Sequence, residues 1–156
     1  HWGCTSSSAE WKTGFAALHM AEDAGPAINL PEIVAEVSAA SARYEAALTA
    51  NDAATIDATF WDSPHTLRYG FGENLYGYEA IAAFRRGQTT GSSKQVRKLL
   101  ITTYGDSTAT VNIEFDRARL GGVGRQSQVW VRFAEGWRIV AAHVSAVTPP
   151  YADSAS

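Results

Sequence analysis

The sequence predicts an α+β domain in which helices cover one face of a curved antiparallel sheet. Two observations carry this prediction. Apolar residues recur at helical spacing between residues 31 and 60, and apolar and polar residues alternate between residues 96 and 147. Helices therefore come first, and long strands joined by short turns follow. That order favours an antiparallel sheet with its helices gathered on one side.

Length and composition fit one globular domain. The chain has 156 residues, of which 46% are hydrophobic and 19% are charged, a balance that argues against wholesale disorder. Its formal net charge is -3 and its basic residues form no stripe, which argues against a nucleic-acid partner. No apolar run is long enough to cross a bilayer, and no signal-peptide pattern opens the chain. We therefore expect a cytoplasmic location and no membrane partner.

The cysteine and histidine residues favour neither a disulfide nor a metal site. The chain contains one cysteine, Cys4, so no internal disulfide can form. No Cys/His zinc spacing occurs, and His143 lacks companion ligands, so we expect no metal and no other cofactor. A Ser/His/Asp triad cannot be placed, and "LGGVGR" lacks the strand–loop–helix context of a phosphate loop.

The segment 1–27 is expected to lie outside the domain. Trp11, Phe15 and Leu18 share one helical face, and the Gly and Pro residues that follow indicate a linker. The segment is either a variable extension or an arm that packs on a partner subunit. We place the domain at residues 28–148 and interpret residues 149–156 as a tail.

Two consecutive helices are predicted at the start of the domain. Pro31 suits the first position of a helix over residues 31–50, where a missing N–H costs nothing. Asn51 and Asp52 end this helix and cap a shorter one over residues 52–60. The inward face of the long helix carries apolar residues at helical spacing, namely Ile33, Val37, Ala40, Tyr44 and Leu48.

A short strand and a third helix are predicted next. The strand "TLRYG" covers residues 66–70 and follows the turn "WDSPH". Gly77 opens the helix "YEAIAAFRRG", and Gly87 closes it.

The second half is predicted to contain the long strands, over residues 96–105, 108–118, 125–133 and 137–147. In the second of these, one face is apolar and carries Ala109, Val111, Ile113 and Phe115. In the last strand, the period of two puts Trp137, His143 and Ser145 on a common face.

Several separated blocks of the sequence resemble one family. "EGWRIVAAHVS" and "GYEAI" are typical of the NTF2-like superfamily, which is also called SnoaL-like or cystatin-like. Together with "INLPEIVAEV", "FWDSPHTLRYGFGENLYGYEAI", "ITTYG" and "GRQSQVWVR", they resemble the AtzH-like family of bacterial NTF2-like proteins over about residues 28–147. The resemblance implies a cone of three helices packed on a strongly bent sheet that encloses a pocket, and a homodimer formed through sheet faces.

The resemblance also implies a chemistry. The characterised member of the family converts 1,3-dicarboxyurea to allophanate with loss of carbon dioxide and without a metal. We therefore expect a hydrolase of the decarboxylating amidohydrolase type, with a small carboxylated urea or amide as its substrate. A non-catalytic ligand-binding or accessory protein is the alternative, since the same fold hosts both. An isomerase or dehydratase of unknown substrate is a third possibility.

Arg68 is the first candidate for catalysis. It occupies a strand position where Val or Ile would be usual, and its guanidinium stays charged and offers a planar fork to a carboxylate. The alternative is a structural ion pair with Glu73, Glu79 or Glu114. The resemblance implies that the arginine of "TLRYG" is catalytic.

Tyr44 and His143 are the other catalytic candidates. Tyr44 is either a core residue or a proton donor beside Arg68, whose charge would lower the pKa of the phenol. The resemblance favours the catalytic interpretation of Tyr44, because the tyrosine of "RYE" matches the family. His143 is either a histidine bonded within the core or, as the resemblance implies, a cavity residue that orients the urea carbonyl together with Gln128.

Polar residues on the predicted strands are candidates for substrate binding. Gln126, Gln128 and Trp130 share a strand face, and buried amides need partners. A polar pocket explains this group, and so does a wet dimer interface on the outer face of the sheet. We assign Glu114, Gln128, Trp130 and Ser145 to the pocket, and Glu73, Asn74 and Tyr76 to its rim.

Overall fold

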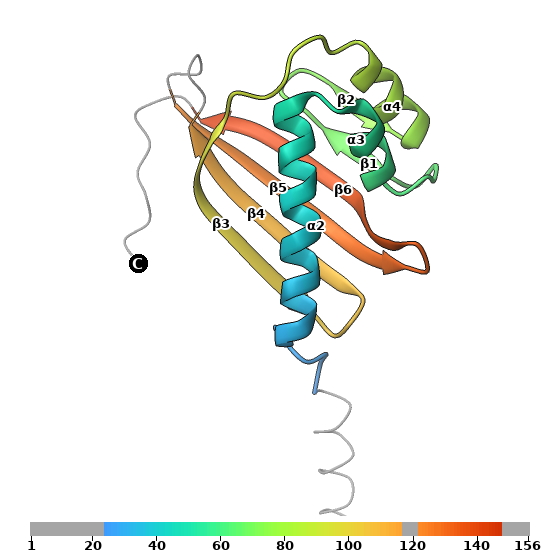
Figure 1. The fold of residues 1–156 in the computed structure, drawn as a ribbon, viewed down its shortest axis with the longest axis vertical. Coiled ribbons are helices and arrows are strands. Elements are labelled where there is room, and N and C mark those ends of the chain that lie inside the picture. Colours follow the sequence, from blue (N-terminus) through green and yellow to red (C-terminus); the bar gives the residue numbers. More distant parts are fainter. Residues whose placement is uncertain (1–23, 117–121, 148–156) are drawn as a thin grey trace, which may run out of the picture.

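The computed structural model describes residues 24–116 and 122–147 of the chain (Figure 1). The helical face predicted at Trp11, Phe15 and Leu18 and the predicted tail lie outside the described residues. Within the described ranges, three helices and one bent sheet form an α+β fold, as predicted. None of these helices is long and apolar enough to cross a membrane.

Six strands form the sheet in the order β2-β1-β6-β5-β4-β3. Their bounds are Leu67–Tyr69 for β1, Asn74–Tyr76 for β2, Gln95–Tyr104 for β3, Thr108–Asp116 for β4, Val123–Phe133 for β5 and Gly136–Val147 for β6. Neighbouring strands run antiparallel, except that β1 runs parallel to β6. The short edge strand β2 was not predicted.

The three helices lie on one face of the sheet, which we call the inner face (Figure 1). They are α2 (Pro31–Ala50), α3 (Ala53–Thr59) and α4 (Tyr78–Arg86). The predicted caps are confirmed. Asn51 ends α2 in the left-handed conformation with φ of 51°, and the Asp52 side chain accepts a hydrogen bond from the Thr55 backbone N–H at 3.2 Å.

The hydrophobic core lies between α2 and the inner face. The apolar face predicted for α2 is buried throughout, at Ile33, Val37, Ala40, Tyr44 and Leu48. The alternation predicted for β4 is also confirmed, with buried side chains at Ala109, Val111, Ile113 and Phe115. The side chains between them in β4 point to the opposite, outer face of the sheet.

A bulge in β6 changes which of its residues face inward. The register with β5 shifts at Val140, which has no partner on β5. Trp137, before the bulge, is buried on the inner face, whereas beyond it Ala142 is buried and His143 is exposed. The prediction that Trp137, His143 and Ser145 share one face is therefore wrong, because one extra residue moves the following side chains to the opposite face.

Candidate functional site

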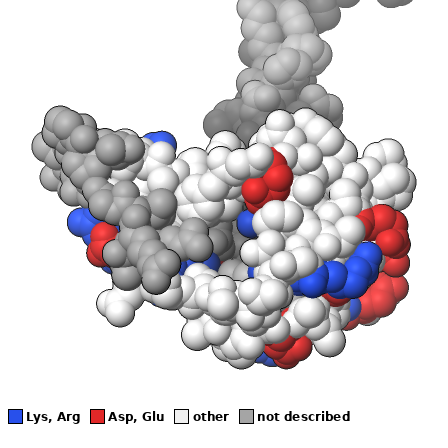
Figure 2. All heavy atoms as spheres, turned by 90° about the horizontal axis from the view of Figure 1, so that it is seen from above, with Lys and Arg blue, Asp and Glu red and all other residues white. Residues whose placement is uncertain are grey.

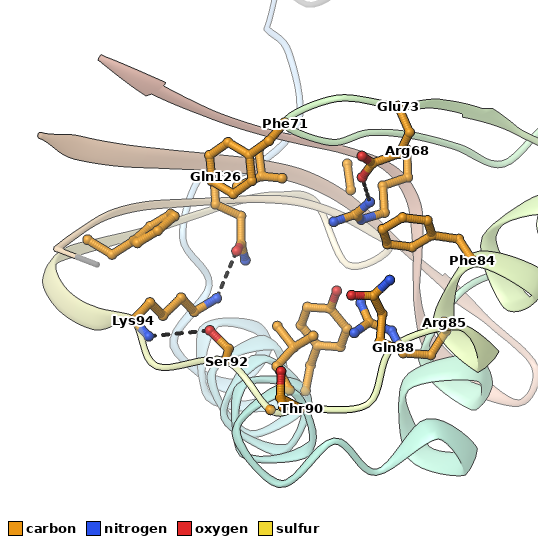
Figure 3. Close-up of a pocket in the computed structure, with 16 residues that line it drawn as sticks. Arg68, Phe71, Glu73, Phe84, Arg85, Gln88, Thr90, Ser92, Lys94 and Gln126 are labelled. Carbon is orange, nitrogen blue, oxygen red and sulfur yellow. Dashed lines mark hydrogen bonds and ion pairs between the residues drawn. The ribbon is translucent and has the colours of Figure 1, made fainter. Parts of the chain in front are cut away.

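A cavity of about 210 Å³ lies between the inner face of the sheet and the helices. Tyr44 of α2, Arg68 of β1 and Arg85 of α4 line it, together with Lys94 from the connector before β3 and Gln126 of β5. The labelled side chains enter the cavity from different sides (Figure 3). Figure 2 looks at the end of the molecule where α4 and β2 lie, and shows a hollow with basic atoms inside and an acidic group at its edge.

Arg68 reaches the cavity because its position in β1 faces inward, between Leu75 of β2 and Ala142 of β6. Its NH1 group donates a hydrogen bond to Glu73 Oε1 at 2.8 Å. Its guanidinium carbon lies 5.1 Å from the centre of the Phe84 ring. Arg68 is thus paired with a glutamate, as the structural alternative predicted, and it also lines a cavity, while its catalytic role stays a prediction.

The turn after β1 holds the Glu73 carboxylate against Arg68. A Cβ atom at Gly70 would overlap Glu73 Oε1, so only glycine permits this close approach. The backbone N–H of Gly72 donates to Glu73 Oε2 at 3.2 Å. The orientation of the guanidinium is therefore fixed by the protein itself. Glu73 lies at the cavity, as predicted.

Tyr44 lines the same cavity but is only 4% exposed. Its ring packs edge-on against Phe60 and Trp130, with ring centres 5.9 and 6.3 Å apart. Burial raises the pKa of Tyr44 to about 12, and the charges of Arg68 and Arg85 offset only part of this rise. The predicted lowering of this pKa is wrong in net direction, because desolvation outweighs the nearby charge.

Sequence reasoning missed Arg85, which enters the cavity opposite Arg68 (Figure 3). Its Nε atom is buried without a hydrogen-bond partner among the described residues. Burial lowers the pKa of Arg85, and the charge of Arg68 lowers it further. The spacing held a signal, because Arg85 follows buried Ile81 by four residues and buried Ala82 by three.

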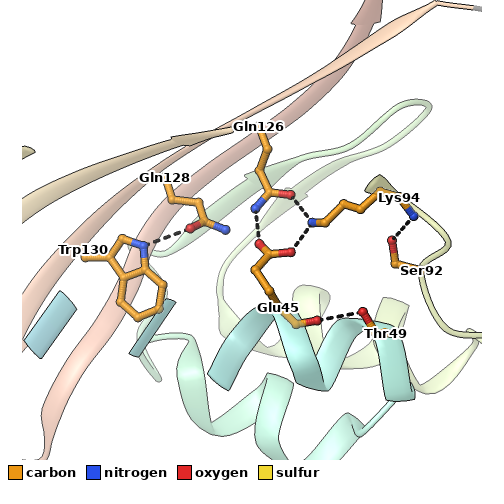
Figure 4. Close-up of polar contacts among 7 residues, drawn as sticks. All are labelled: Glu45, Thr49, Ser92, Lys94, Gln126, Gln128 and Trp130. Carbon is orange, nitrogen blue, oxygen red and sulfur yellow. Dashed lines mark hydrogen bonds and ion pairs between the residues drawn. The ribbon is translucent and has the colours of Figure 1, made fainter. Parts of the chain in front are cut away.

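A second charged group includes two residues that line the cavity, Lys94 and Gln126, and its contacts are drawn in Figure 4. Lys94 forms an ion pair with Glu45 of α2 and donates to the side-chain oxygen of Gln126 at 2.8 Å. Gln126 in turn donates to Glu45 at 2.9 Å. The Lys94 ammonium also lies 5.5 Å from the centre of the Phe115 ring. The need for a partner at Gln126 was predicted, but no pattern in the sequence indicates that the partners are Lys94 and Glu45.

The connector between α4 and β3 is tied to the end of α2. The backbone N–H of Ser92 donates to the Leu48 carbonyl at 2.9 Å. A Cβ atom at Gly91 would overlap the Thr49 carbonyl oxygen, so the connector passes α2 at a distance that only glycine allows. This connector forms one wall of the cavity.

Gln128 and Trp130 lie on the inner face but do not line the cavity that contains Tyr44 and Arg68. They are 2% and 0% exposed, and the Trp130 indole N–H donates to the Gln128 side-chain oxygen at 2.9 Å (Figure 4). The two side chains therefore satisfy each other within the core. The structure does not support their assignment to substrate contact.

The remaining predicted site residues lie outside the cavity, namely Asn74, Tyr76, Glu114, His143 and Ser145. The bulge in β6 accounts for the last two. Glu114 alternates with the buried residues of β4 and so belongs to the outer face. Asn74 and Tyr76 alternate with Leu75, whose position lies beside Arg68. These placements correct the sequence-based assignment.

On the outer face, three rings form a small cluster instead. The rings of Tyr69 and His143 meet edge-on with centres 5.9 Å apart, and those of Tyr69 and Tyr76 with centres 6.0 Å apart. The sheet separates this cluster from the cavity. Over residues 24–116 and 122–147, no group of three or more His, Cys, Asp or Glu side chains could hold a metal ion.

Comparison with known proteins assigns the chain to a family. The sequence model of the AtzH-like family matches residues 26–150. The chain belongs to the AtzH-like family. A protein of unknown function from Pectobacterium atrosepticum is 48% identical, with a TM-score of 0.75 over 78% of this chain and 95% of that one. A cystatin-like fold protein from Burkholderia xenovorans is 43% identical, with a TM-score of 0.77 over 81% of this AtzH-like chain and 100% of that one.

More distant structures share the fold. An NTF2-like protein of unknown function from Pseudomonas putida is 15% identical and has a TM-score of 0.63, over 76% of this chain and 95% of that one. At this identity the likeness shows the fold alone. The AtzH-like chain therefore has the NTF2-like, cystatin-like fold that its sequence blocks implied. No match was found among curated proteins.

Proposed function

We propose that this AtzH-like protein is a metal-free enzyme that removes carbon dioxide from a small carboxylated urea or amide, such as 1,3-dicarboxyurea. The observation that carries the proposal is that Tyr44 and Arg68 line one cavity. A buried phenol is a proton donor, and a guanidinium binds a carboxylate. The cavity of about 210 Å³ is smaller than the sites that bind drug-sized ligands, which suits a substrate of this size.

The chemistry requires a proton at one nitrogen. Each N-carboxylate of a carboxylated urea is a carbamate, and loss of carbon dioxide breaks its N–C bond and leaves the electron pair on nitrogen. The balanced change is R–NH–COO⁻ + H⁺ → R–NH₂ + CO₂. A group that donates to the nitrogen as the bond breaks lowers the barrier.

Tyr44 supplies this proton. With a pKa of about 12, its phenol is protonated at neutral pH and is ready to donate. The nitrogen anion of a urea is a stronger base than a phenolate, so the transfer is favourable. The nearby guanidinium of Arg68 stabilises the phenolate until solvent returns the proton.

Arg68 holds the carboxylate that is retained. Glu73 accepts a bond from NH1, which leaves the other N–H groups of the fork to the substrate. Gln126 also lines the cavity, and the amide N–H that Glu45 does not accept would donate to the urea carbonyl. It replaces Gln128 and His143, the residues predicted for that task.

A non-catalytic ligand-binding or accessory protein is the second candidate. The observation that favours it is that two of the three cations in the cavity are already paired with glutamates, Arg68 with Glu73 and Lys94 with Glu45. Such pairs can serve to build a binding site without taking part in a reaction, and the fold hosts both kinds of protein.

The test is release of carbon dioxide from freshly prepared 1,3-dicarboxyurea and from mono-carboxylated analogues. Arg68→Lys should lower kcat/KM on the order of 10- to 100-fold, because lysine lacks the planar fork. Arg125→Lys, on the outer face of β5, is the matched control and should leave kcat/KM unchanged. Wild-type turnover in Arg68→Lys would make Arg68 structural. Binding of carboxylated ureas without any turnover would favour the second candidate.

A further inference from the structure

We infer that Arg85 and Arg68 together form a clamp of two guanidinium groups that holds a single carboxylate of the ligand. The inference rests on the proposed function, because it specifies how the same cavity binds its anion. It assigns a ligand-binding role to Arg85, a residue that belongs to none of the candidates predicted from the sequence.

The charged side chains around the cavity do not balance one another. Lys94 is paired with Glu45, and Arg68 is paired with Glu73. Among the described residues, no carboxylate lies within ion-pair distance of Arg85. These five side chains therefore carry one positive charge in excess. One bound carboxylate would balance it.

An unpaired, half-buried guanidinium is costly to the folded state. The Nε atom of Arg85 is buried without a hydrogen-bond partner in the described part of the chain. Buried donors in folded proteins are almost always paired, so an exception requires an explanation. Burial and the like charge of Arg68 lower the pKa of Arg85 by more than Tyr44, Asp57 and Glu73 raise it, so a bound anion would stabilise its cationic form.

The two arginines also lie on opposite sides of the cavity (Figure 3). Arg68 extends from β1 and Arg85 from the last turn of α4, and their guanidinium groups point into the same space from opposite sides (Figure 3). The charges of both act on the phenol of Tyr44. An anion between the two guanidinium groups would relieve their repulsion and would lie beside the proton donor.

The test is binding of N-carbamoylglycine, a stable urea with one carboxylate, measured by titration calorimetry. Its neutral amide, N-carbamoylglycinamide, is the control ligand. Wild type should bind the acid more tightly than the amide. Arg85→Met should weaken binding of the acid on the order of 10- to 100-fold and should leave binding of the amide unchanged.

Arg86 gives a matched control on the same helical turn. It is exposed and does not line the cavity, so Arg86→Met should bind both ligands as wild type does. Arg85→Lys should recover part of the affinity for the acid, because it restores the charge but not the planar fork. Equal loss in Arg85→Met and Arg86→Met would overturn the clamp.

Thermal stability without ligand separates a binding role from a structural role. Arg85→Met keeps most of the aliphatic stem and removes an unpaired charge that Arg68 repels. Its melting temperature should therefore equal or exceed that of wild type, while stabilisation by N-carbamoylglycine is lost. A lower melting temperature with unchanged binding would overturn the proposal. So would a wild-type protein that does not bind the acid, or that binds acid and amide equally.

Failure of the clamp and failure of the enzyme are distinguishable. If Arg85-dependent binding occurs but no carboxylated urea releases carbon dioxide, the clamp stands and the enzymatic function falls. If carbon dioxide is released at the same rate by wild type and Arg85→Met, the clamp falls and the enzymatic function stands.

Discussion

Strand β5 carries polar side chains on both faces of the sheet, but it buries only those of the inner face. Gln126 and Gln128 are 7% and 2% exposed, and each is hydrogen-bonded to other side chains. Ser127 stands between them on the outer face, where it is exposed and donates to Asn112 at 2.7 Å. Polar residue types alone therefore do not mark the site, because both faces have them. Burial with a partner marks the inner face.

The two faces also differ in where their neighbours come from. The outer face brings together side chains of adjacent strands, such as Tyr69 and His143. The inner face receives charged groups from outside the sheet, including Glu45 of α2, Arg85 of α4 and Lys94 of the connector. There, opposite and like charges from separate elements converge on one cavity, which is what acid–base and anion chemistry require.

The largest effect is expected when the hydroxyl group of Tyr44 is removed from the inner face, with removal of the Tyr69 hydroxyl from the outer face as the control. Tyr44→Phe should lower kcat for carbon dioxide release on the order of 10²- to 10⁴-fold, because a positioned proton donor is lost. Tyr69→Phe removes an outer-face hydroxyl and should leave kcat unchanged. Steady-state release of carbon dioxide from 1,3-dicarboxyurea measures both. Equal rates in the two variants would show that the inner face has no special chemistry.

The sequence predicted most of the fold for local reasons. The helical spacing from Ile33 to Leu48 and the alternation from Ala109 to Phe115 each depend on one element, and both are confirmed. Arg68 and Tyr44 could be selected because a charge in a strand and a phenol on an apolar helix face are locally unusual. Both line the cavity.

The missed parts of the site depend on long-range geometry. His143 was assigned to the cavity by simple alternation, and a bulge at Val140 reverses its direction. Nothing near the bulge in the sequence marks it, since Val140 lies in an apolar run without glycine or proline. Lys94 and Glu45 meet only because the connector returns to α2. Neither segment alone carries a sequence pattern that predicts this contact.

The second prediction compares ion pairs of different burial. The side chains of Lys94 and Glu45 are 8% and 20% exposed, whereas those of Arg132 and Glu36 are 35% and 45% exposed. Lys94→Met should lower the free energy of unfolding by about 3 kcal/mol, because it leaves Glu45 largely buried without its cation. Arg132→Met should lower it by less than about 1 kcal/mol. Urea denaturation measures both, and equal losses would contradict the difference in burial.

The third prediction concerns the pKa of Tyr44, which rises from 10.0 to about 12 in the folded chain. Between these two pH values the folded state keeps a proton that the unfolded state releases. The free energy of unfolding should therefore be unaffected below pH 10 and should fall as the pH rises through this window, by up to about 3 kcal/mol. Tyr44→Phe should remove this contribution, and Tyr104→Phe should retain it. Urea unfolding at a series of pH values from 9 to 12 would measure the free energy of unfolding of wild type and of each variant. The same pH dependence in wild type and Tyr44→Phe would contradict the raised pKa.

The smallest effect is expected on the outer face, through which we propose that the protein forms a homodimer. Leu99 and Leu100 are neighbours on β3 and are 49% and 53% exposed, but they point to opposite faces. Leu100 pairs with Asn112 on the outer face, whereas Leu99 pairs with buried Ile113. Leu100→Lys would bury a charge in the proposed interface and should weaken self-association about tenfold or more, while Leu99→Lys should leave it unchanged. Sedimentation velocity at micromolar concentrations measures this difference. The proposed interface would be contradicted if wild type is a monomer, or if the two variants weaken self-association equally.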